Sequence, residues 1–320
     1  MFPTGFDLKS LFVFACVVET GGMTQAARAL EMTQSSVSQS VGNLETALGT
    51  ALFDRSVRPM VLTHAGNTFY MRSKEVLEGA GNLLRNTQES ENLAFESLTL
   101  GLVESFANTV GPHLIMQLPN LARKWRILAG TSPDQHEALT NYEVDMIVST
   151  DDHGANLDVL SEYGILEEQF VLVFPKGYRG PVEGIRVVEG LPFIRYSLRS
   201  SIGRQVERQI SRMRLHFPVH SEFETAMGQL ALVGMGAGWS ITTPMCLLQE
   251  RNQLENIQVH PIKRGRFSRK FTLVTRAGGM EKTAEVVAKK SQKILREQLF
   301  PDLFKQLPWL EQTILWGESA

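Results

Sequence analysis

The chain has 320 residues, of which 43% are hydrophobic and 21% are charged, and its formal net charge is −2. The composition is that of a globular protein, and the length exceeds what one hydrophobic core usually serves, so two or more domains are expected. No uninterrupted apolar run approaches the roughly 18 residues of a transmembrane helix, and the opening MFPTGFDLKS lacks the basic and apolar regions of a signal peptide. We therefore expect a cytoplasmic protein without a membrane partner.

Residues 23–48 have the pattern of a helix-turn-helix. Ala26, Ala27 and Leu30 share one face of the first helix, and the small alanines let a second helix cross close by. Glu31 and Met32 follow as the turn. An ordinary pair of amphipathic helices would give part of the same pattern, so the assignment depends on the residues that come next.

The second helix of this motif is expected from residue 34 to residue 48. Thr33 can cap its start, because the hydroxyl accepts one of the unpaired N–H groups of the first turn. One face repeats apolar residues at the helical period, namely Val37, Val41, Leu44 and Leu48. The other face carries short or amide side chains that can bond base edges and phosphates, namely Gln34, Ser35, Ser38 and Gln39.

A small wing and a long helix complete this region. Gly49 ends the second helix, and two short apolar runs, 51–53 and 60–62, flank a basic tip that holds Arg55 and Arg58. From Thr63 to about residue 93 a helical pattern has one apolar side, formed by Phe69, Val76, Leu77, Ala80, Leu83 and Leu84. No folded partner for this stripe lies nearby in sequence. Pairing with the same helix of a second copy would bury it, and packing on its own domain is the alternative.

In order and spacing, these features resemble the amino-terminal part of LysR-type transcriptional regulators. The resemblance rests on the segments 11–12, 14, 24–30, 33–39, 44–45, 48–49, 52–55, 62–63 and 65–66. It implies a winged helix-turn-helix domain over residues 1–63, a linker and dimerisation helix over residues 64–94, and double-stranded promoter or operator DNA as the partner. The residues expected to contact DNA are Thr24, Arg28, Thr33, Gln34, Ser35, Ser36, Ser38, Gln39, Arg55 and Arg58.

Charge and three departures from the family pattern qualify this picture. Gly22 stands where a serine cap is common, Gln39 stands where an arginine is common, and Gly42 in mid-helix costs about 1 kcal/mol relative to alanine. Through residue 90, Lys and Arg total seven while Asp and Glu total eight. Phosphate neutralisation supplies most non-specific DNA affinity, so a single copy should bind weakly. We therefore expect a homo-oligomer, a dimer or a tetramer, that multiplies half-sites.

Beyond residue 95, short apolar strand patterns alternate with helical ones, which predicts a parallel sheet with covered faces. The expected strands are 98–103, 125–128, 146–148, 170–174, 192–196, 239–241 and 271–275. The resemblance implies two α/β subdomains like those of periplasmic solute-binding proteins, one formed by residues 95–163 with 268–300 and the other by residues 164–267. The chain would cross between them near residues 162–167 and 261–270. Residues 301–320 form an apolar C-terminal extension that should pack on a subdomain or on a neighbouring subunit.

The expected fold class is therefore mixed: an all-α winged helix-turn-helix domain, a long linker helix, and an α/β effector-binding region of two subdomains. In open α/β sheets, ligands bind where strands lead into helices and N–H groups are available. Hydroxyl side chains occupy three such junctions, with arginines beside the third. The candidates for effector binding are Ser105, Thr131, Ser132, Arg195, Arg199, Ser200, Ser201 and Arg204.

The effector and its charge follow from the resemblance and from these arginines. The family binds a small-molecule effector between the subdomains, and the basic segment 195–214 indicates an organic anion. At helical spacing several of its arginines must face solvent, so only Arg195, Arg199 and Arg204 are retained. For each hydroxyl residue, a helix cap or a surface position is the alternative interpretation.

No catalytic or metal-binding pattern stands out. Cys16 and Cys246 are far apart and flanked by apolar residues, which favours buried free thiols. The seven histidines lack metal-ligand spacing. Residues 234–238, GMGAG, follow a helix and precede a strand, the reverse of a dinucleotide-binding fingerprint. We expect no catalytic residue, metal or cofactor; the competing hypotheses, an enzyme or a solute-binding protein, would need a nucleophile–base pair or an export signal.

Overall fold

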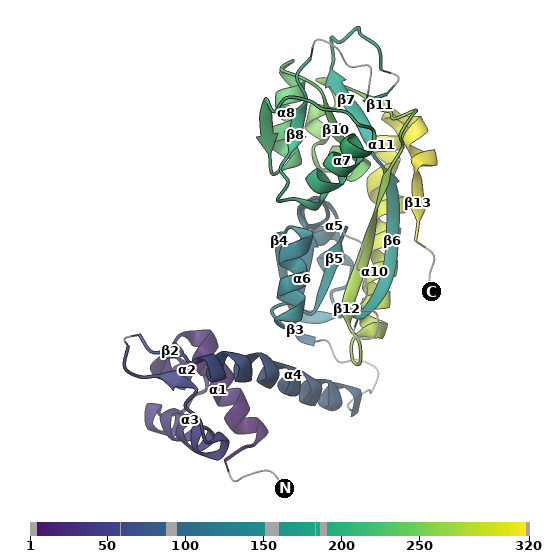
Figure 1. Ribbon diagram of the computed structural model, residues 1–320. Coiled ribbons are helices and arrows are strands. Elements are labelled where there is room, and N and C mark those ends of the chain that lie inside the picture. The colour runs from purple at the N-terminus through teal and green to yellow at the C-terminus, as the bar shows by residue number, and fades with distance from the viewer. Residues whose placement is uncertain are drawn as a thin grey trace. The chain divides into compact units, whose positions relative to one another are not determined.

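The computed structural model describes residues 5–57, 59–87, 95–150, 160–182, 184–185 and 191–317, and within the helix that ends at Thr87 the side chains of residues 78 and 82–87 are also outside the description. The chain divides into two compact units, Met1–Glu91 and Asn92–Ala320 (Figure 1). Each unit is described by itself.

The first unit is a three-helix core with a two-stranded wing and a long helix. Its helices are α1 (Leu8–Thr20), α2 (Met23–Ala29), α3 (Gln34–Leu48) and α4 (His64–Thr87), and its strands are β1 (Phe53–Asp54) and β2 (Val61–Leu62). Local signals set these bounds. The Asp7 carboxylate accepts the Ser10 N–H at 2.7 Å and caps α1, and Gly49 ends α3 in the left-handed conformation at φ 67°.

The wing is tied to α3 by one carboxylate. Glu45 accepts the N–H groups of Leu52 and Phe53 at 2.8 and 3.1 Å. Strands β1 and β2 pair antiparallel, with Phe53 opposite Leu62. The predicted wing is thus present, and so are the predicted turn, where Glu31 has a φ of 53°, and the predicted cap, where Thr33 accepts the Ser36 N–H at 3.1 Å.

The apolar stripe predicted on the long helix divides between two environments. Phe69 packs in the core of its own unit, with its ring centroid 5.4 Å from that of Phe14. About two turns further on, Val76 is 50% exposed. The side chains of Leu83 and Leu84 and the predicted end of the linker at residues 88–94 lie outside the described residues. The start of the stripe therefore serves the domain itself, and only the part from Val76 onward is available to a partner.

A six-stranded sheet anchors the second unit, in the order β13-β6-β12-β5-β3-β4. These strands are β3 (Phe95–Val103), β4 (Ala122–Gly130), β5 (Met146–Ser149), β6 (Leu160–Gln169), β12 (Ser268–Arg276) and β13 (Ile314–Trp316). Strands β4, β3 and β5 run parallel, whereas β12, β6 and β13 join them antiparallel. The sheet is therefore mixed: the predicted parallel pairing holds for β4, β3 and β5, and the antiparallel strands β12, β6 and β13 were not predicted. Helices α5 (Glu104–Gln117), α6 (Ser132–Thr140) and α10 (Glu281–Ile294) pack against it.

A second, smaller layer of sheet follows along the chain. Strands β7 (Val171–Pro175), β10 (Ser240–Thr242) and β11 (Ile257–Pro261) form an antiparallel sheet with β7 at its centre. Strands β8 (Ile194–Tyr196) and β9 (Ser221–Phe223) pair in parallel beside it. Helices α7 (Ser201–Arg212), α8 (Ala226–Gly234) and α9 (Pro244–Gln249) and a 3-10 helix, Arg251–Gln253, complete this subdomain. Its core includes the fully buried Trp239.

The chain passes between the two sheets through two strands that lie side by side. Strand β6 remains paired with β12 from Leu160 through Gln169, and Phe170 alone separates it from β7. The predicted boundary between residues 163 and 164 falls inside this strand and is therefore wrong; the first sheet extends to Gln169. The returning strand β12 begins at Ser268, where the second boundary was predicted.

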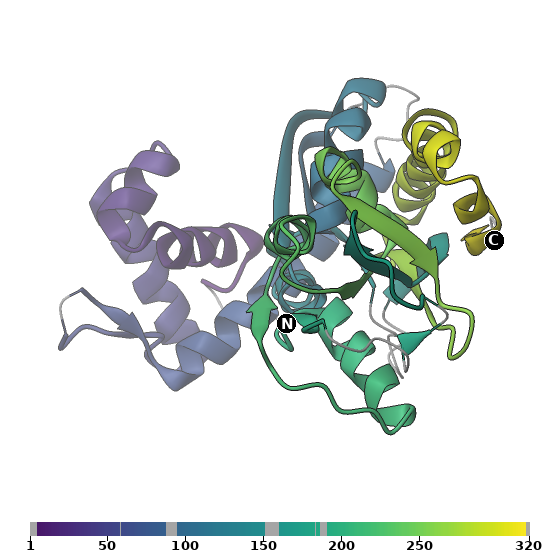
Figure 2. The ribbon, with the colours of Figure 1, turned by 90° about the horizontal axis from the view of Figure 1, so that it is seen from above.

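The C-terminal segment packs on the first subdomain, as predicted for an apolar extension. A π-helical turn (Leu295–Leu299), α11 (Phe300–Gln306) and a 3-10 helix (Pro308–Thr313) lead to β13, which pairs with the outer edge of β6. Gln292 on α10 donates to the carbonyl oxygens of Gly164 and Gly317, both at 2.9 Å. In Figures 1 and 2 this segment runs along one side of the second unit.

Three general properties complete the description. Within the described residues, no single helix has both the length and the apolarity to cross a membrane, while the bent pair α1–α2, at 115°, meets those two criteria together. Cys16 and Cys246 are both free thiols. Among the described residues no group of three or more His, Cys, Asp or Glu side chains is placed to hold a metal ion.

Candidate functional site

The exposed face of α3 presents a polar surface in the first unit. Gln34, Ser35, Ser36 and Gln39 are exposed and Ser38 is half-buried, while Val37, Val41 and Leu44 are fully buried on the opposite face. The Thr33 hydroxyl lies 2.7 Å from the hydroxyl of Ser36 and fixes the start of the helix. Helix α3 can therefore enter a groove without disturbing the core beneath it.

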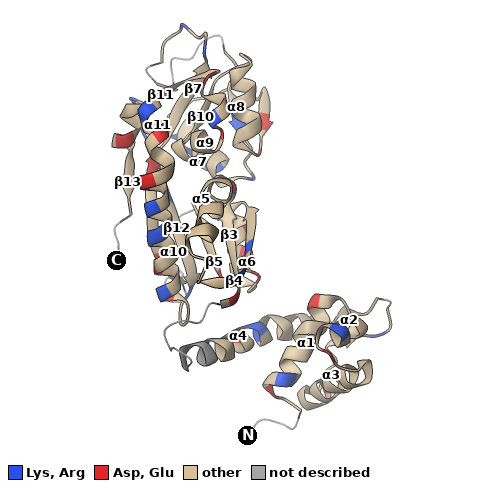
Figure 3. Ribbon diagram, turned by 180° about the vertical axis from the view of Figure 1, so that it is seen from behind, with Lys and Arg blue, Asp and Glu red and all other residues tan. Residues whose placement is uncertain are grey.

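Basic residues beside this face are few. Thr24 and Arg28 are exposed on α2. At the wing, Arg55 forms an ion pair with Glu45 at 2.8 Å, although 55% of the Arg55 side chain is still exposed. Arg58 lies outside the described residues. Figure 3 shows acidic and basic segments interspersed over this unit, in agreement with its near-neutral charge.

A pocket of about 360 Å³ lies between the two subdomains of the second unit. One wall comes from the ends of β3, β4 and β5, and the other comes from the starts of α7 and α8 together with α9. Six of the eight predicted effector residues line it, namely Ser105, Thr131, Ser132, Arg199, Ser200 and Ser201. The rule that strand-to-helix junctions gather at one edge of a sheet thus brings together residues that are far apart in sequence.

Helix N-termini supply much of the polarity of this pocket. Helices α6 and α7 are capped by their own hydroxyl residues, Thr131 and Ser200. Helices α5 and α8 begin at the pocket without a side-chain cap, after Val103 and Thr225 respectively. Their first N–H groups are therefore donors that a bound acceptor can satisfy, and the positive ends of both helix dipoles favour a negative charge there.

The Ser105 side chain adds a hydroxyl at the same place. Ser105 is the second residue of α5 and is 7% exposed. Within the described part of the chain its hydroxyl makes no hydrogen bond. By contrast, the Ser132 and Thr150 hydroxyls lie 3.3 Å apart and the Thr131 hydroxyl donates to Asp134 at 2.7 Å. Ser105 is thus a polar group of the pocket that is still open to a ligand.

Two predicted arginines do not reach this pocket. The Arg195 guanidinium, on β8, pairs with Glu207 on α7 and donates to the carbonyl oxygen of Phe217. Arg204 turns back along its helix and donates to the carbonyl oxygens of Leu198 and Arg199, at 3.3 and 3.0 Å. Neither residue lines the pocket, so Arg195 and Arg204 are withdrawn as candidates for effector binding.

The floor of the pocket holds a buried ion pair that the sequence did not reveal. Arg269 and Glu168 are 5% and 0% exposed and lie 2.8 Å apart. Arg269 also donates to the hydroxyl of Thr243 at 2.7 Å, and Glu168 accepts the N–H of Met245 at 2.8 Å. Burial by itself would lower the pKa of Arg269, but Glu168 and Cys246 raise it, so the guanidinium stays charged.

Tyr196 and Cys246 flank this pair and also line the pocket. Burial, with Cys246 beside it, holds the pKa of the Tyr196 phenol well above 10, so it stays protonated and lies 2.9 Å from the hydroxyl of Thr242. Arg269 stands between Ser268 and Lys270 at the start of β12, so its sequence neighbours give no sign that it is buried. Its partner lies 101 residues away, which no local pattern reports.

The acidic side chains around the pocket all have partners. Glu104 accepts from Gln249 at 3.3 Å, Asp134 accepts from Thr131, and Glu224 pairs with Arg199 at 2.8 Å. The pocket therefore combines uncapped helix starts and hydroxyls with three carboxylates and two arginines among its described lining residues. The helix starts and hydroxyls, rather than an excess of positive side chains, favour an acceptor group there.

Two family models match the parts of the chain that carry these two sites. The model of the family described as "Bacterial regulatory helix-turn-helix protein, lysR family" matches residues 8–67, and that of the "LysR substrate binding domain" matches residues 91–289. The chain belongs to the LysR family. It is a LysR-type DNA-binding transcriptional regulator, with the winged helix-turn-helix in its first unit and the family's substrate-binding domain in its second.

Individual relatives of this LysR-type chain are distant. It is 28% identical over 176 residues to the transcriptional regulator SoxR of Arthrobacter sp., a match that spans 52% of this chain and 57% of SoxR. It is 28% identical over 264 residues to the transcriptional regulator CatR of Pseudomonas putida, covering 79% of this chain and 88% of CatR. Both are regulators, and neither match identifies an effector for this chain.

A solved structure supports the fold along nearly the whole chain. A full-length OxyR variant from Pseudomonas aeruginosa superposes with a TM-score of 0.72 at 18% sequence identity, covering 90% of this chain and 95% of that one. The LysR-type arrangement of a winged helix-turn-helix followed by a substrate-binding domain is therefore shown.

Proposed function

We propose that this LysR-type regulator reads its operator with α3 and the wing and responds to a small organic anion bound between its subdomains. The observation that carries the effector proposal is the meeting of two uncapped helix starts, α5 and α8, with the open Ser105 hydroxyl in one pocket. A carboxylate at that point would accept hydrogen bonds from N–H groups that have no side-chain cap.

The pocket's charge sets a limit on the ligand. Among its described lining residues, the Glu224 carboxylate pairs with Arg199, while Glu104 and Asp134 accept from the neutral side chains of Gln249 and Thr131. Glu168 balances Arg269, so the helix starts supply most of the attraction for an anion. We infer a ligand with one carboxylate and an otherwise neutral body, small enough for about 360 Å³. The residues proposed to hold it are Ser105, Thr131, Ser132, Arg199, Ser200 and Ser201, with Tyr196 and Arg269 at the floor.

On the DNA side, the proposed contacts are those exposed beside α3. Gln34, Ser35, Ser38 and Gln39 would contact bases or phosphates, with Thr24, Arg28, Thr33 and Ser36 nearby and Arg55 and Arg58 on the backbone. Because Arg55 is already paired with Glu45, its contribution should be the weaker one. Loss of a good base contact should cost about 1–3 kcal/mol at its operator position.

Oligomerisation would make up for the low positive charge. The exposed Val76 and the half-buried Leu77 lie beyond the part of α4 that packs on its own unit, so this segment is the proposed dimer contact. Two such dimers would form a tetramer that binds several half-sites in the cytoplasm. The substitution Leu77→Glu should then produce monomers that bind DNA poorly, and a variant that remains dimeric in sedimentation would contradict this interface.

Calorimetry on the full chain tests the effector proposal. The probes are carboxylates matched with their neutral amides, such as benzoate with benzamide and butyrate with butyramide. At least one acid should bind while its amide does not, Ser105→Ala should weaken that binding, and Ser97→Ala, at an exposed position on β3, should not. Operator affinity should be the same in both variants. A preference for amides, or indifference to Ser105→Ala, would refute the assignment.

A further inference from the structure

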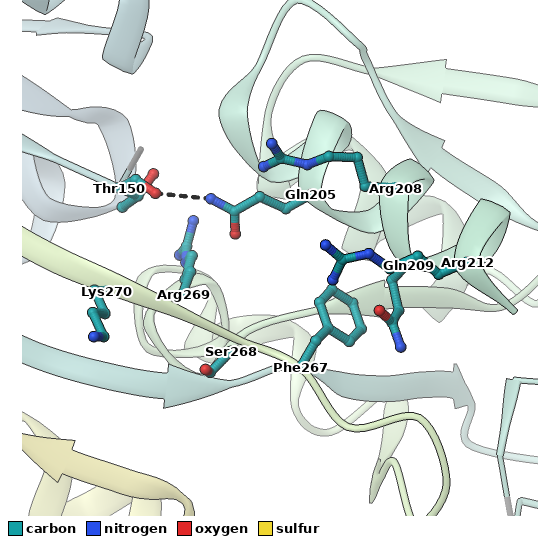
Figure 4. A pocket seen from close by; sticks show the side chains of 9 residues that line it. All are labelled: Thr150, Gln205, Arg208, Gln209, Arg212, Phe267, Ser268, Arg269 and Lys270. Carbon is teal, nitrogen blue, oxygen red and sulfur yellow. Dashed lines mark hydrogen bonds between the residues drawn. The ribbon is translucent and has the colours of Figure 1, made fainter. Parts of the chain in front are cut away.

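A second cavity, of about 330 Å³, lies beside the first (Figure 4). Its walls are one face of α7 and the start of β12. The lining residues are Thr150, Gln205, Arg208, Gln209, Arg212, Phe267, Ser268, Arg269 and Lys270. Thr150 and Arg269 also line the effector pocket, and the Gln205 amide donates to the carbonyl oxygen of Thr150 at 2.8 Å.

The described lining of this cavity is basic, whereas that of the effector pocket has three carboxylates and two arginines. Among the described residues that line the second cavity, four are cationic and none is acidic. Two of the cations have partners behind the cavity: Arg269 pairs with Glu168 at 2.8 Å, and Lys270 approaches Glu167 at 3.9 Å. Arg208 and Arg212 have no ion pair or hydrogen bond among the described residues. Within the part of the chain that the structure describes, the cavity therefore presents two positive charges without a counter-charge.

The two arginines share one face of α7. Gln205, Arg208, Gln209 and Arg212 follow the i, i+3, i+4, i+7 spacing of a helix face. Ile202, Val206 and Ile210 are buried on the opposite face. Like charges four residues apart destabilise a helix slightly unless a counter-charge lies between them. Both guanidiniums extend toward the cavity in Figure 4, where an anion would remove this repulsion.

The Gln205 amide adds a second requirement, a hydrogen-bond donor on the ligand. Its nitrogen is fixed by Thr150 and also donates to the hydroxyl of Ser201 at 3.2 Å, which leaves the oxygen on the cavity side. That oxygen is buried and has no hydrogen-bond partner among the described residues. In Figure 4 it points into the space between Arg269 and Arg212. A buried amide oxygen needs a donor, which an anionic group cannot supply.

We propose that this cavity is a second ligand site for a small hydroxylated anion, either a phosphate ester or a hydroxy acid with two negative charges. The anionic groups bind Arg208 and Arg212, with Lys270 beside them, and a hydroxyl of the ligand donates to the Gln205 oxygen. The site is separate from the effector pocket, and it stands whether or not that pocket binds a carboxylate. Gln205 on α7 bonds to Thr150 in the other subdomain. A ligand bound in this cavity therefore acts on a contact between the subdomains that also borders the effector pocket.

Calorimetry on the full chain with L-malate, succinate and glycerol 3-phosphate tests the site. Malate and glycerol 3-phosphate represent the two sources of a hydroxylated anion, and succinate is malate without its hydroxyl. At least one of the first two should bind saturably with one site per chain, and malate should bind more tightly than succinate. The double variant Arg208→Gln, Arg212→Gln should lose at least about tenfold in affinity.

The controls separate this site from general charge effects and from the effector pocket. Arg126→Gln removes one exposed charge on β4 and should leave affinity within about twofold, because a distant exposed charge is screened by salt. Ser105→Ala should also leave it unchanged. The proposal is overturned if neither malate nor glycerol 3-phosphate binds, if the arginine pair has no more effect than Arg126, or if Ser105→Ala removes the binding and so assigns the probe to the effector pocket.

Discussion

Replacement of Glu168 by glutamine should strongly destabilise the second unit. Glu168 lies on β6 where the chain passes between the two sheets, and one carboxylate oxygen accepts from Arg269 at 2.8 Å. The other accepts the N–H of Met245 in the first turn of α9, also at 2.8 Å. The carboxylate thus joins both crossing strands to a helix start. Glutamine keeps the shape but leaves the Arg269 charge without its counter-ion.

The size of the effect follows from burial. Arg269 and Glu168 are 5% and 0% exposed, and removal of one partner from such a pair typically costs about 3–5 kcal/mol, because a buried charge is left uncompensated. Arg269 borders two cavities, from which water can approach it. We therefore expect a loss of about 3 kcal/mol, more than a hundredfold in the folding equilibrium.

Urea unfolding followed by tryptophan fluorescence is the suitable assay. All four tryptophans, Trp125, Trp239, Trp309 and Trp316, lie in the second unit, so the signal reports that unit alone. Glu285→Gln is the matched control, because Glu285 and Lys289 form an exposed pair, 41% and 52% accessible, four residues apart on α10. Its loss should cost about 0.3–0.5 kcal/mol.

The difference in unfolding free energy between these two variants tests whether the buried ion pair stabilises the crossing between the sheets. If Glu168→Gln costs no more than Glu285→Gln, the Glu168–Arg269 pair does not stabilise the crossing, and the charged floor attributed to the effector pocket is wrong. A loss of cooperativity in place of a shifted midpoint would show that the two subdomains unfold separately once the pair is lost, which would support a pair that joins them.

Three further predictions follow from single residues. Gly66→Ala should destabilise the first unit by about 1–3 kcal/mol or more, because its Cβ would lie 1.9 Å from the carbonyl oxygen of Leu52; hydrogen exchange of α3 and α4 measures this. Gly42→Ala should slow exchange in α3, since the added Cβ meets nothing within 4 Å and alanine is favoured in mid-helix by about 1 kcal/mol; faster exchange would contradict it. Burial, with Lys263 nearby, lowers the pKa of His260 below 6.5, so as the pH falls the unfolded chain is protonated at this residue before the folded chain is. The urea concentration at the unfolding midpoint should therefore decrease once the pH is below about 6.5, and it should decrease less in His260→Gln.

The first unit was predictable from sequence because its signals are local. The Thr33 cap, the Gly49 stop and the turn at Glu31 each depend on neighbours within a few residues, and the structure contains all three. The period of Val37, Val41 and Leu44 likewise identified the buried face of α3. The apolar stripe of the long helix was the exception. Its first part does not face a second copy, because Phe69 packs against Phe14 of α1, far back in the sequence.

In the second unit, the junction rule placed hydroxyl residues in one pocket, while strands and charges with distant partners escaped detection. Strand β6 alternates weakly and carries Glu162, Glu167 and Glu168, so its sequence resembles a polar connection. Its pairing with β12, a hundred residues on, is what makes it a strand. The sheet is mixed for the same reason.

Arginines were the hardest residues to assign. Helical spacing shows which face of α7 is buried, but it does not show what the other face meets. Arg195 was taken for a ligand contact although Glu207 and Phe217 occupy it. Arg208 and Arg212 were left out of the candidate set, because several arginines of the segment must face solvent, although these two line a cavity with β12. Only the tertiary arrangement of α7 against the crossing strands distinguishes these cases.

The most direct test of the account is footprinting on the DNA that flanks the gene of this protein. The unmodified chain should protect two or more half-sites spaced by about one helical turn of DNA. The double variant Gln34→Ala, Ser38→Ala should lose that protection, while Thr46→Ala, at an exposed position on the same helix, should keep it. Protection that is unchanged in the double variant, with the same sequence preference, would contradict the assignment of α3 as the element that reads DNA.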